Sequence, residues 1–273
     1  MRARHRLVTT ALAVATAVLL VPTSVGAVDT TVSKPPANGQ FDYQIGGDYK
    51  PDSTVKIVDR DRTSKPAAGF YNICYINAFQ SQAEDAHWWK NHHPHLLLHD
   101  AKGHLVEDPG WPGEYMLNTA TRHSRAKLAK VEDKWLDGCK ADGFDATEPD
   151  NLDSNTRSHH LLTQADDFAF AKVLIAHAHQ IGLAIAQKNS AGHTKEGSQI
   201  GFDFAIAEEC QVYNECQRYT KHYGDLVYEV EYTDNPLKYY KKSCTLRGDQ
   251  ISVILRDRDV TPRGNEHYHY EAC

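Results

Sequence analysis

Short apolar runs alternate with longer helix-like segments along most of the chain, and this alternation most restricts how the chain can fold. Arg122–Gly138 and Ala165–Gly182 carry apolar residues at the spacing of one helix face, and each ends on a glycine stop signal. Strands that alternate with helices predict a parallel sheet, and eight or nine strands in ~235 residues favour a closed (β/α)8 TIM barrel. We expect strands at Phe41–Gly46, Val55–Asp59, Ile73–Asn77, Leu96–His99, Gly143–Thr147, Leu183–Lys188, Phe202–Ala207, Leu226–Glu231 and Ile251–Leu255.

The first 27 residues have the pattern of an export signal. Arginines stand within the first six positions, Leu7–Val21 is mostly apolar, and the residues up to Ala27 are small enough for a cleavage site. An uncleaved N-terminal anchor is the alternative, but the apolar run is shorter than the ~20 residues of a membrane span. We therefore expect a secreted protein without membrane contact after cleavage. Its parts would be a signal peptide (residues 1–27), a disordered lead-in (28–39) and a single α/β barrel domain (40–273).

The mature chain is expected to be acidic. The whole sequence has 30 Lys and Arg against 36 Asp and Glu, for a net charge of −6, and the acid-free leader carries three of the arginines. Without the leader the net charge becomes −9. Because basic residues supply most of the affinity for phosphate backbones, no nucleic-acid partner is expected, and neutral or cationic partners fit better.

Six cysteines in an exported chain predict a barrel stabilised by three disulfides. Fifteen pairings are possible, and the sequence does not choose among them. Cys210 and Cys216 are close enough for a local bridge, and a bridge to Cys273 would hold the last residue in place. A metal site is the alternative, but no Cys-x-x-Cys spacing occurs.

Polar and acidic side chains follow most of the expected strands at the point where the strand ends. In a (β/α)8 barrel, the active site lies at this end. A single carboxylate there is more often a member of an ion pair than a catalyst. However, an unpaired buried carboxylate is costly, so its repetition after many strands indicates a site. The catalytic candidates are Asp145, Glu148, Asp150, Glu208 and Glu209.

Side chains alternate between the two faces of a strand, so the sequence predicts which of these acids point into the barrel and which point toward the helices. In the fifth expected strand, Ala146 should face the helices and Asp145 the barrel interior. In the seventh, Phe204 should face the helices, which favours Glu209 over Glu208 as the inward acid unless the end of the strand twists, so the alternation alone leaves this pair open.

Two carboxylates from different strand ends suit glycoside hydrolysis. One serves as a general acid, and the other as a nucleophile or as a base for water, with a separation that distinguishes retention from inversion. Further acids would hold a cationic amino sugar, and the aromatic side chains of Trp88, Trp89, Trp111, Tyr43 and Tyr49 are candidates to stack on sugar rings. The substrate-binding candidates are Asp42, Tyr43, Gln44, Tyr75, Asn77, Asn151, Asp153, Lys188, Asn189, Glu231, Tyr232, Arg256 and Asp257.

Several motifs together resemble glycoside hydrolase family 114. They are Phe41–Gly47, Tyr71–Phe79, Gly143–Asp153, Gln187–Asn189, Phe202–Cys210 and Ser252–Arg258, and the resemblance covers nearly all of residues 40–273. That family is named for endo-α-1,4-polygalactosaminidase and has a TIM-barrel catalytic domain. The resemblance implies an endo-acting hydrolase of cationic or partly acetylated galactosamine polysaccharide.

The resemblance also implies a catalytic acidic pair. Some relatives have Glu-Gln-Cys at the second motif, which matches Glu208 and moves the preference there from Glu209. Others accept Asp or Glu at position 148, so Asp150 becomes the preferred nucleophile, with Asp145 behind it, and Glu208 the acid/base. We expect no cofactor and a monomer.

Two other functions remain open at this point. The sequence holds 16 histidines, several of them between His92 and His104, which would suit a metal-dependent polysaccharide deacetylase. No His-Glu-x-x-His motif supports it, and we expect no metal site. A secreted carbohydrate-binding barrel without catalysis is the other alternative, although both acidic motifs are present.

Overall fold

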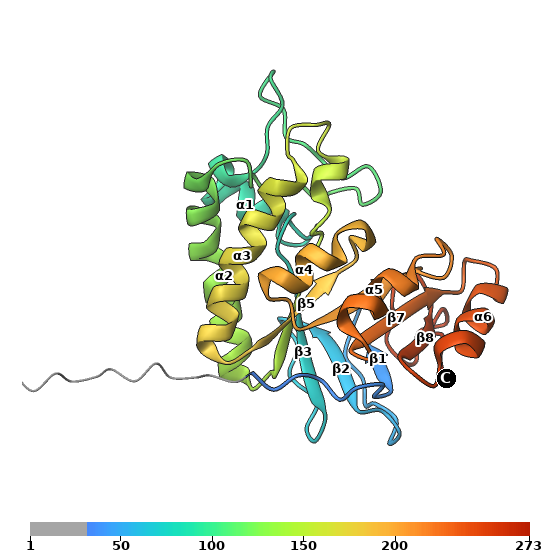
Figure 1. Cartoon of the computed structure of the whole chain (residues 1–273). Coiled ribbons are helices and arrows are strands. Elements are labelled where there is room, and N and C mark those ends of the chain that lie inside the picture. Colours follow the sequence, from blue (N-terminus) through green and yellow to red (C-terminus); the bar gives the residue numbers. More distant parts are fainter. Residues whose placement is uncertain (1–31) are drawn as a thin grey trace, which may run out of the picture.

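Eight parallel strands stand side by side in the order of the sequence, and a ninth runs antiparallel to the eighth (Figure 1). The structure is a computed structural model that describes residues 32–273, so the expected signal peptide lies outside the described residues. The predicted α/β TIM barrel is confirmed in a nearly closed form. The strands are β1 (Phe41–Tyr43), β2 (Ile57–Asp61), β3 (Tyr71–Asn77), β4 (Ala146–Asp150), β5 (Ala184–Lys188), β6 (Phe204–Glu208), β7 (Val227–Tyr232), β8 (Ser252–Arg256) and β9 (Tyr270–Ala272).

Helices cover the outside of the barrel from β3 onward, and α2 and α3 pack side by side (Figure 1). The connections from β1 to β2 and from β2 to β3 contain no helix, so this barrel departs from a regular (β/α)8 pattern. None of the helices in residues 32–273 is long and apolar enough to cross a membrane. The helices are α1 (Ala86–His92), α2 (Arg122–Asp142), α3 (Gln164–Ile181), α4 (Thr194–Ile200), α5 (Cys216–Tyr223) and α6 (Lys238–Arg247), with 3-10 turns η1 (Pro94–Leu96), η2 (Ser154–Arg157) and η3 (Ala191–His193).

Side chains from all eight parallel strands fill the barrel interior. The rings of Phe41 and Phe204 both lie against Tyr228, with centroids 5.6 and 5.9 Å away. Small side chains from the neighbouring strands, Ala146 and Ala184, leave room for these rings. Large and small residues thus combine to fill a narrow interior at the density of a protein core.

The expected facing of β4 and β6 is therefore wrong. Ala146 and Phe204 belong to the interior cluster, whereas Ala205 and Ala207 pack in the cluster that the helices share. Alanines on the outer face let helices approach the sheet closely, and the interior needs the larger rings. Because side chains alternate along a strand, Glu208 shares the facing of Phe204 and points toward the mouth of the barrel.

One expected strand is absent, and one expected helix end is wrong. Leu96–His99 is not a strand: it begins at the end of η1, and only isolated bridges pair Leu97 and His99 with the following loop. Helix α2 continues past Gly138 to Asp142, and Gly143, with φ of 100°, caps its end. A glycine inside a helix is tolerated, whereas the left-handed cap favours glycine directly, so the second glycine ends the helix.

The described part of the lead-in, residues 32–39, accepts hydrogen bonds from the barrel. Tyr71 donates its hydroxyl to the Ser33 carbonyl at 2.6 Å, and Tyr228 donates to the Pro36 carbonyl at 2.9 Å. Both tyrosines come from the first residues of their strands, so the segment packs across the end of the barrel opposite the carboxyl ends of the strands.

The six cysteines form three disulfides, as predicted. Cys74–Cys139 joins β3 to α2, and Cys244–Cys273 joins α6 to the C-terminal residue, which lies beside that helix in Figure 1. Cys210–Cys216 closes the short loop that follows β6.

Candidate active site

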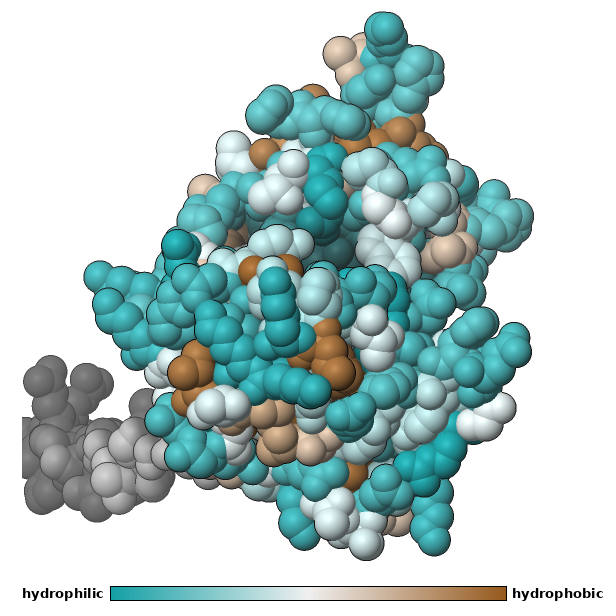
Figure 2. Space-filling model, turned by 90° about the vertical axis from the view of Figure 1, so that its right-hand side faces the viewer, coloured by the Kyte–Doolittle hydropathy of each residue, from teal (hydrophilic) through white to brown (hydrophobic). Residues whose placement is uncertain are grey.

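A cavity of about 540 Å³ lies over the carboxyl ends of the strands. Its lining is strongly acidic, with only two arginines as counter-charges. Figure 2 shows a hollowed, mainly hydrophilic area on the face of the molecule that it presents. The acidic lining residues are Glu84, Asp108, Glu114, Asp150, Asp153, Glu208, Glu209 and Asp259, and the basic ones are Arg157 and Arg258.

Three charged residues end three successive strands at the bottom of this cavity. Asp150 ends β4, Lys188 ends β5 and Glu208 ends β6. The Lys188 Nζ atom lies 3.3 Å from Asp150 Oδ1 and 3.5 Å from Glu208 Oε2. Lys188 is only 1% exposed, whereas both carboxylates line the cavity. The strand order thus places one buried cation between two carboxylates that a substrate can reach.

Hydrogen bonds fix the Asp150 carboxylate. Oδ2 accepts the hydroxyl of Tyr75 at 2.9 Å, and Oδ1 accepts the backbone N–H of Asn151 at 2.7 Å. Together with Lys188, these donors hold the carboxylate in one orientation.

A different set of donors holds Glu208. Tyr232 donates its hydroxyl to Oε1, and the Asn189 side chain donates to Oε2 at 2.9 Å and accepts the Glu208 backbone N–H at 2.9 Å. Gln187 in turn donates to the Asn189 carbonyl at 2.9 Å and fixes the turn after β5. The Glu208 side chain remains 24% exposed, compared with 16% for Asp150.

Glu148 lies below the cavity and does not line it. Its Oε1 atom is 2.8 Å from Lys188 Nζ and accepts the Tyr43 hydroxyl at 3.2 Å, and Lys188 also donates to that hydroxyl at 3.0 Å. Burial raises the pKa of Glu148. Burial alone would lower the pKa of Lys188, but the surrounding carboxylates, Asp150 first, raise it well above its ordinary value. Lys188 is therefore a permanent cation beneath the two accessible acids.

Glu209 lies at the rim of the cavity rather than at its bottom. Its Oε1 accepts Arg258 Nη2 at 2.7 Å and the Asn235 side chain at 2.5 Å. Arg258, which no strand-end argument selected, lies two residues beyond β8 and also pairs with Asp234. This ion pair satisfies the Glu209 carboxylate within the protein.

One wall of the cavity comes from a loop that the strand-end argument missed. Glu114, in the connection between η1 and α2, accepts the Asn77 side chain at 3.2 Å and the Gln80 side chain at 2.6 Å. Burial raises the pKa of Glu114 to about 7. Asn77 also accepts the Asn151 side chain at 2.8 Å, so the predicted pair of asparagines supports this wall. Nothing in the spacing of apolar residues points to Glu114, because it follows no strand.

Arg157 joins the predicted residues Asn151 and Asp153 to the same wall. It donates to Asn151 at 2.9 Å, to Asp153 at 3.0 Å and to Asp108 at 2.7 Å. Arg157 and Asp108 were not selected from the sequence, since Arg157 lies in the 3-10 turn η2 and Asp108 in a loop.

Four predicted binding residues, Asp42, Gln44, Arg256 and Asp257, lie away from the cavity lining, and the last two fix the C-terminal segment instead. Arg256 donates to the Tyr43 carbonyl and, at 2.8 and 2.9 Å, to the Thr261 and His269 carbonyls. Asp257 accepts the Thr261 and His269 backbone N–H groups at 2.8 and 3.2 Å. Asp42 accepts the Gln44 side chain at 2.8 Å. No helix covers β1, so these polar groups replace the helix that a regular barrel would have there.

Two further predicted acids are also outside the cavity lining. Asp145 precedes β4, at the opposite end of that strand from Asp150, and accepts the Asn72 backbone N–H at 2.9 Å. Glu231 alternates with the interior residues of β7 and accepts the Gln211 backbone N–H at 2.9 Å, where burial raises its pKa to about 8.

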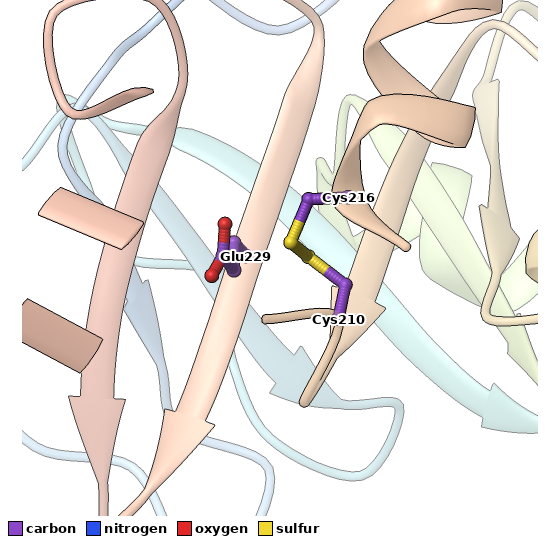
Figure 3. Close-up of side chains that lie close together, drawn as sticks. All are labelled: Cys210, Cys216 and Glu229. Carbon is purple, nitrogen blue, oxygen red and sulfur yellow. A yellow bond between two sulfur atoms is a disulfide. The ribbon is translucent and has the colours of Figure 1, made fainter. Parts of the chain in front are cut away.

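A group of potential metal ligands lies beside the loop after β6. Sulfur atoms of Cys210 and Cys216 and a carboxylate oxygen of Glu229 come within 4.8 Å of one another (Figure 3). The two sulfurs are bonded to each other, so neither offers the thiolate that binds a metal. The group therefore consists of a structural disulfide next to a buried carboxylate.

The fold is similar to two solved structures. Ega3 of Aspergillus fumigatus, in complex with galactosamine, has a TM-score of 0.72 and 22% identity, covering 90% of this chain and 100% of that chain. The glycoside hydrolase domain of PelA from Pseudomonas aeruginosa has a TM-score of 0.54 and 13% identity, covering 83% of this chain and 96% of that chain. No curated protein sequence matches the chain. The sequence pattern of glycoside-hydrolase family GH114 matches residues 22–273, so the chain belongs to that family.

Proposed function

We propose that this protein is a secreted, endo-acting hydrolase that cleaves α-1,4-linked galactosamine-containing polysaccharide, with Asp150 as nucleophile and Glu208 as acid/base. One observation carries the proposal: two accessible carboxylates end β4 and β6 and share a buried lysine at the bottom of an acidic cavity. Family membership supports glycoside hydrolysis. The export-type leader and three disulfides support secretion.

The surroundings of the two acids support this assignment of roles. A nucleophile must be ionised, and Asp150 receives a tyrosine hydroxyl, a backbone N–H and the nearer contact with Lys188. An acid/base must exchange its proton during each cycle, and Glu208 is the more exposed of the two.

The charge of the cavity supports an amino sugar as substrate. Eight acidic side chains in the lining outnumber its two arginines and the buried Lys188 beneath it, and this excess of negative charge attracts protonated amines. The similar structure of Ega3 was solved with galactosamine. A polymer of partly deacetylated galactosamine would present amines along its length and thus fits this lining.

We predict that wild-type protein releases reducing ends from partly deacetylated α-1,4-galactosaminogalactan with retention of the α configuration. The nearer oxygens of the two carboxylates lie 3.3 and 3.5 Å from one nitrogen, and such close placement favours the ~5–5.5 Å separation of retaining enzymes over the ~6.5–9.5 Å of inverting ones. Proton NMR during the first minutes would show the product anomer. A first-formed β anomer would contradict retention, and polymer binding without cleavage would favour the non-catalytic carbohydrate-binding alternative.

We further predict that Glu114→Gln removes a pH effect on substrate binding. Burial raises the pKa of Glu114 to about 7, so this group is neutral below that pH and anionic above it. An anionic Glu114 attracts a protonated amine, so KM for the deacetylated polymer should fall as pH rises through about 7 in the wild type. The variant should lack this fall. Fully N-acetylated polymer is the control, because it has no amine for Glu114 to attract; an equal KM profile for both proteins on deacetylated polymer would contradict the role.

A further inference from the structure

A second cavity, of about 620 Å³, continues from the first one. Both are lined by Asp153, Asn189, Glu208 and Glu209, so they form one cleft that passes over the Glu208 carboxylate. The second cavity is bounded by η2, the start of α3, η3 and the loop after β6. We call the first cavity the Asp150 arm and the second the Tyr213 arm, after a residue that lines only that one.

The two arms differ in which proposed catalytic group they reach. Asp150 lines only its own arm, whereas Glu208 lines both. In glycoside hydrolysis the nucleophile attacks the anomeric carbon of the sugar that it will hold, and the acid protonates the oxygen that departs with the other part of the chain. The sugar that is attacked must therefore lie over Asp150, and the departing sugar must leave on the side where only Glu208 is present.

We propose that the Tyr213 arm binds the departing part of the polysaccharide, with the Tyr213 ring as its sugar-stacking surface, and that the Asp150 arm binds the part that forms the covalent intermediate. This assignment rests on the proposed function. It orients the polymer, because the reducing-end side of each cleaved bond occupies the Tyr213 arm.

Tyr213 is presented on a constrained loop. Its side chain is 67% exposed, although the loop that carries it is closed by the Cys210–Cys216 disulfide (Figure 3). Its backbone N–H donates to the Glu209 carbonyl at 3.1 Å, and the Glu215 N–H donates to the Cys210 carbonyl at 2.8 Å. The disulfide and these bonds order the loop before substrate arrives, so stacking on this ring incurs little loss of backbone entropy.

The chemistry of the arm fits a protonated amino sugar. The acidic side chains of Asp153, Glu209 and Glu215 line this arm, and His193 is the one basic side chain in the described lining. The Asp150 arm offers a matched aromatic surface in Trp111, which is 51% exposed and lines only that arm. Each arm therefore has one exposed ring, and the pair allows a symmetrical test.

The test compares Tyr213→Ala and Trp111→Ala on two substrates. One is the deacetylated polymer, which fills both arms; the other is a galactosamine oligomer with a dinitrophenyl group at its reducing end, which places no sugar in the leaving-group arm. Loss of one stacking surface should lower kcat/KM roughly 3- to 10-fold. We expect Tyr213→Ala to lower the polymer value and leave the dinitrophenyl value within about 2-fold, whereas Trp111→Ala should lower both.

Other results would overturn the assignment. A reversed pattern, with the dinitrophenyl substrate sensitive to Tyr213→Ala and not to Trp111→Ala, would mean that the polymer lies in the opposite direction. Unchanged polymer values for Tyr213→Ala would exclude a stacking role. An inactive wild type on both substrates would refute the proposed function itself, which is a distinguishable outcome. Normal dinitrophenyl hydrolysis by Tyr213→Ala also shows that the variant is folded.

Discussion

The variants Asp150→Asn and Glu208→Gln are each expected to cleave galactosamine polymer at least ~100-fold more slowly than the wild type. Both substitutions keep the shape of the side chain and remove the charge or proton that the reaction uses. Each acid keeps its neighbours in the fold: Tyr75 beside Asp150, and Asn189 beside Glu208. Reducing-end release, measured on proteins with unchanged circular dichroism, gives the rates.

The two losses should differ when the leaving group needs no protonation. A dinitrophenyl group departs without an acid, so Glu208→Gln should still form the covalent intermediate rapidly and show a burst of dinitrophenolate. Asp150→Asn lacks the proposed nucleophile and should show no burst. The opposite pattern would exchange the two roles and leave the pair intact.

Neighbouring acids provide the controls. Asp145→Asn lies at the other end of β4 and should leave activity unchanged. Glu209→Gln alters a carboxylate that is paired with Arg258 at the rim, and its effect should be much smaller than that of Glu208→Gln. If instead only Glu209→Gln or Asp145→Asn abolished cleavage, the function would stand and the proposed pair would be wrong.

The alternation of strands and helices was sufficient to predict the barrel, because each parallel strand needs a crossover and each buried strand needs an apolar run. It did not predict that the connections following β1 and β2 contain no helix. Polar residues that resemble a ligand site have structural partners instead: Arg256, at the end of β8, donates to the His269 carbonyl in the C-terminal segment, and Asp42 of β1 lies 3.7 Å from Arg256. A polar residue at a strand end therefore indicates a site only where helices already cover the outside.

The prediction of which side chains of β4 and β6 point into the barrel was wrong for a related reason. The sequence places rings and alanines on opposite faces of β6, and we assigned the rings to the helices. In a small barrel the interior also needs bulk, so ring size alone does not distinguish the two faces. The family resemblance moved the preference to Glu208, because it relates individual positions in the sequence to those of relatives, which the periodicity of apolar residues does not do. Neither the strand-end pattern nor the family resemblance identified Glu114, because it reaches the cavity from a long loop.

Lys188→Met is expected to cause the second large effect, on stability and on the pH profile together. Met has a similar length and no charge, so the variant would leave Glu148, Asp150 and Glu208 around an uncharged side chain. Breaking a buried ion pair by removal of one partner typically costs about 3–5 kcal/mol of stability. The neighbouring carboxylates raise the pKa of Lys188, so its contribution is fully present below the ~10.4 of an unfolded lysine and is lost only as pH rises above that value. Urea unfolding at neutral pH should therefore show the full loss.

The pH profile separates a role in the reaction from a role in folding alone. Without the lysine, no positive charge offsets the repulsion among Glu148, Asp150 and Glu208, and repulsion between like charges disfavours their charged forms. The acid limb of kcat/KM for the folded variant should move upward by at least about one pH unit, and activity at pH 5 should fall more than activity at pH 8. Tyr43→Phe is the matched control, because it removes a hydrogen bond at 3.0 Å to the same nitrogen and keeps the charge. An unmoved acid limb in Lys188→Met, with lower stability only, would mean that the buried lysine holds the strands together and does not set the ionisation of the catalytic pair.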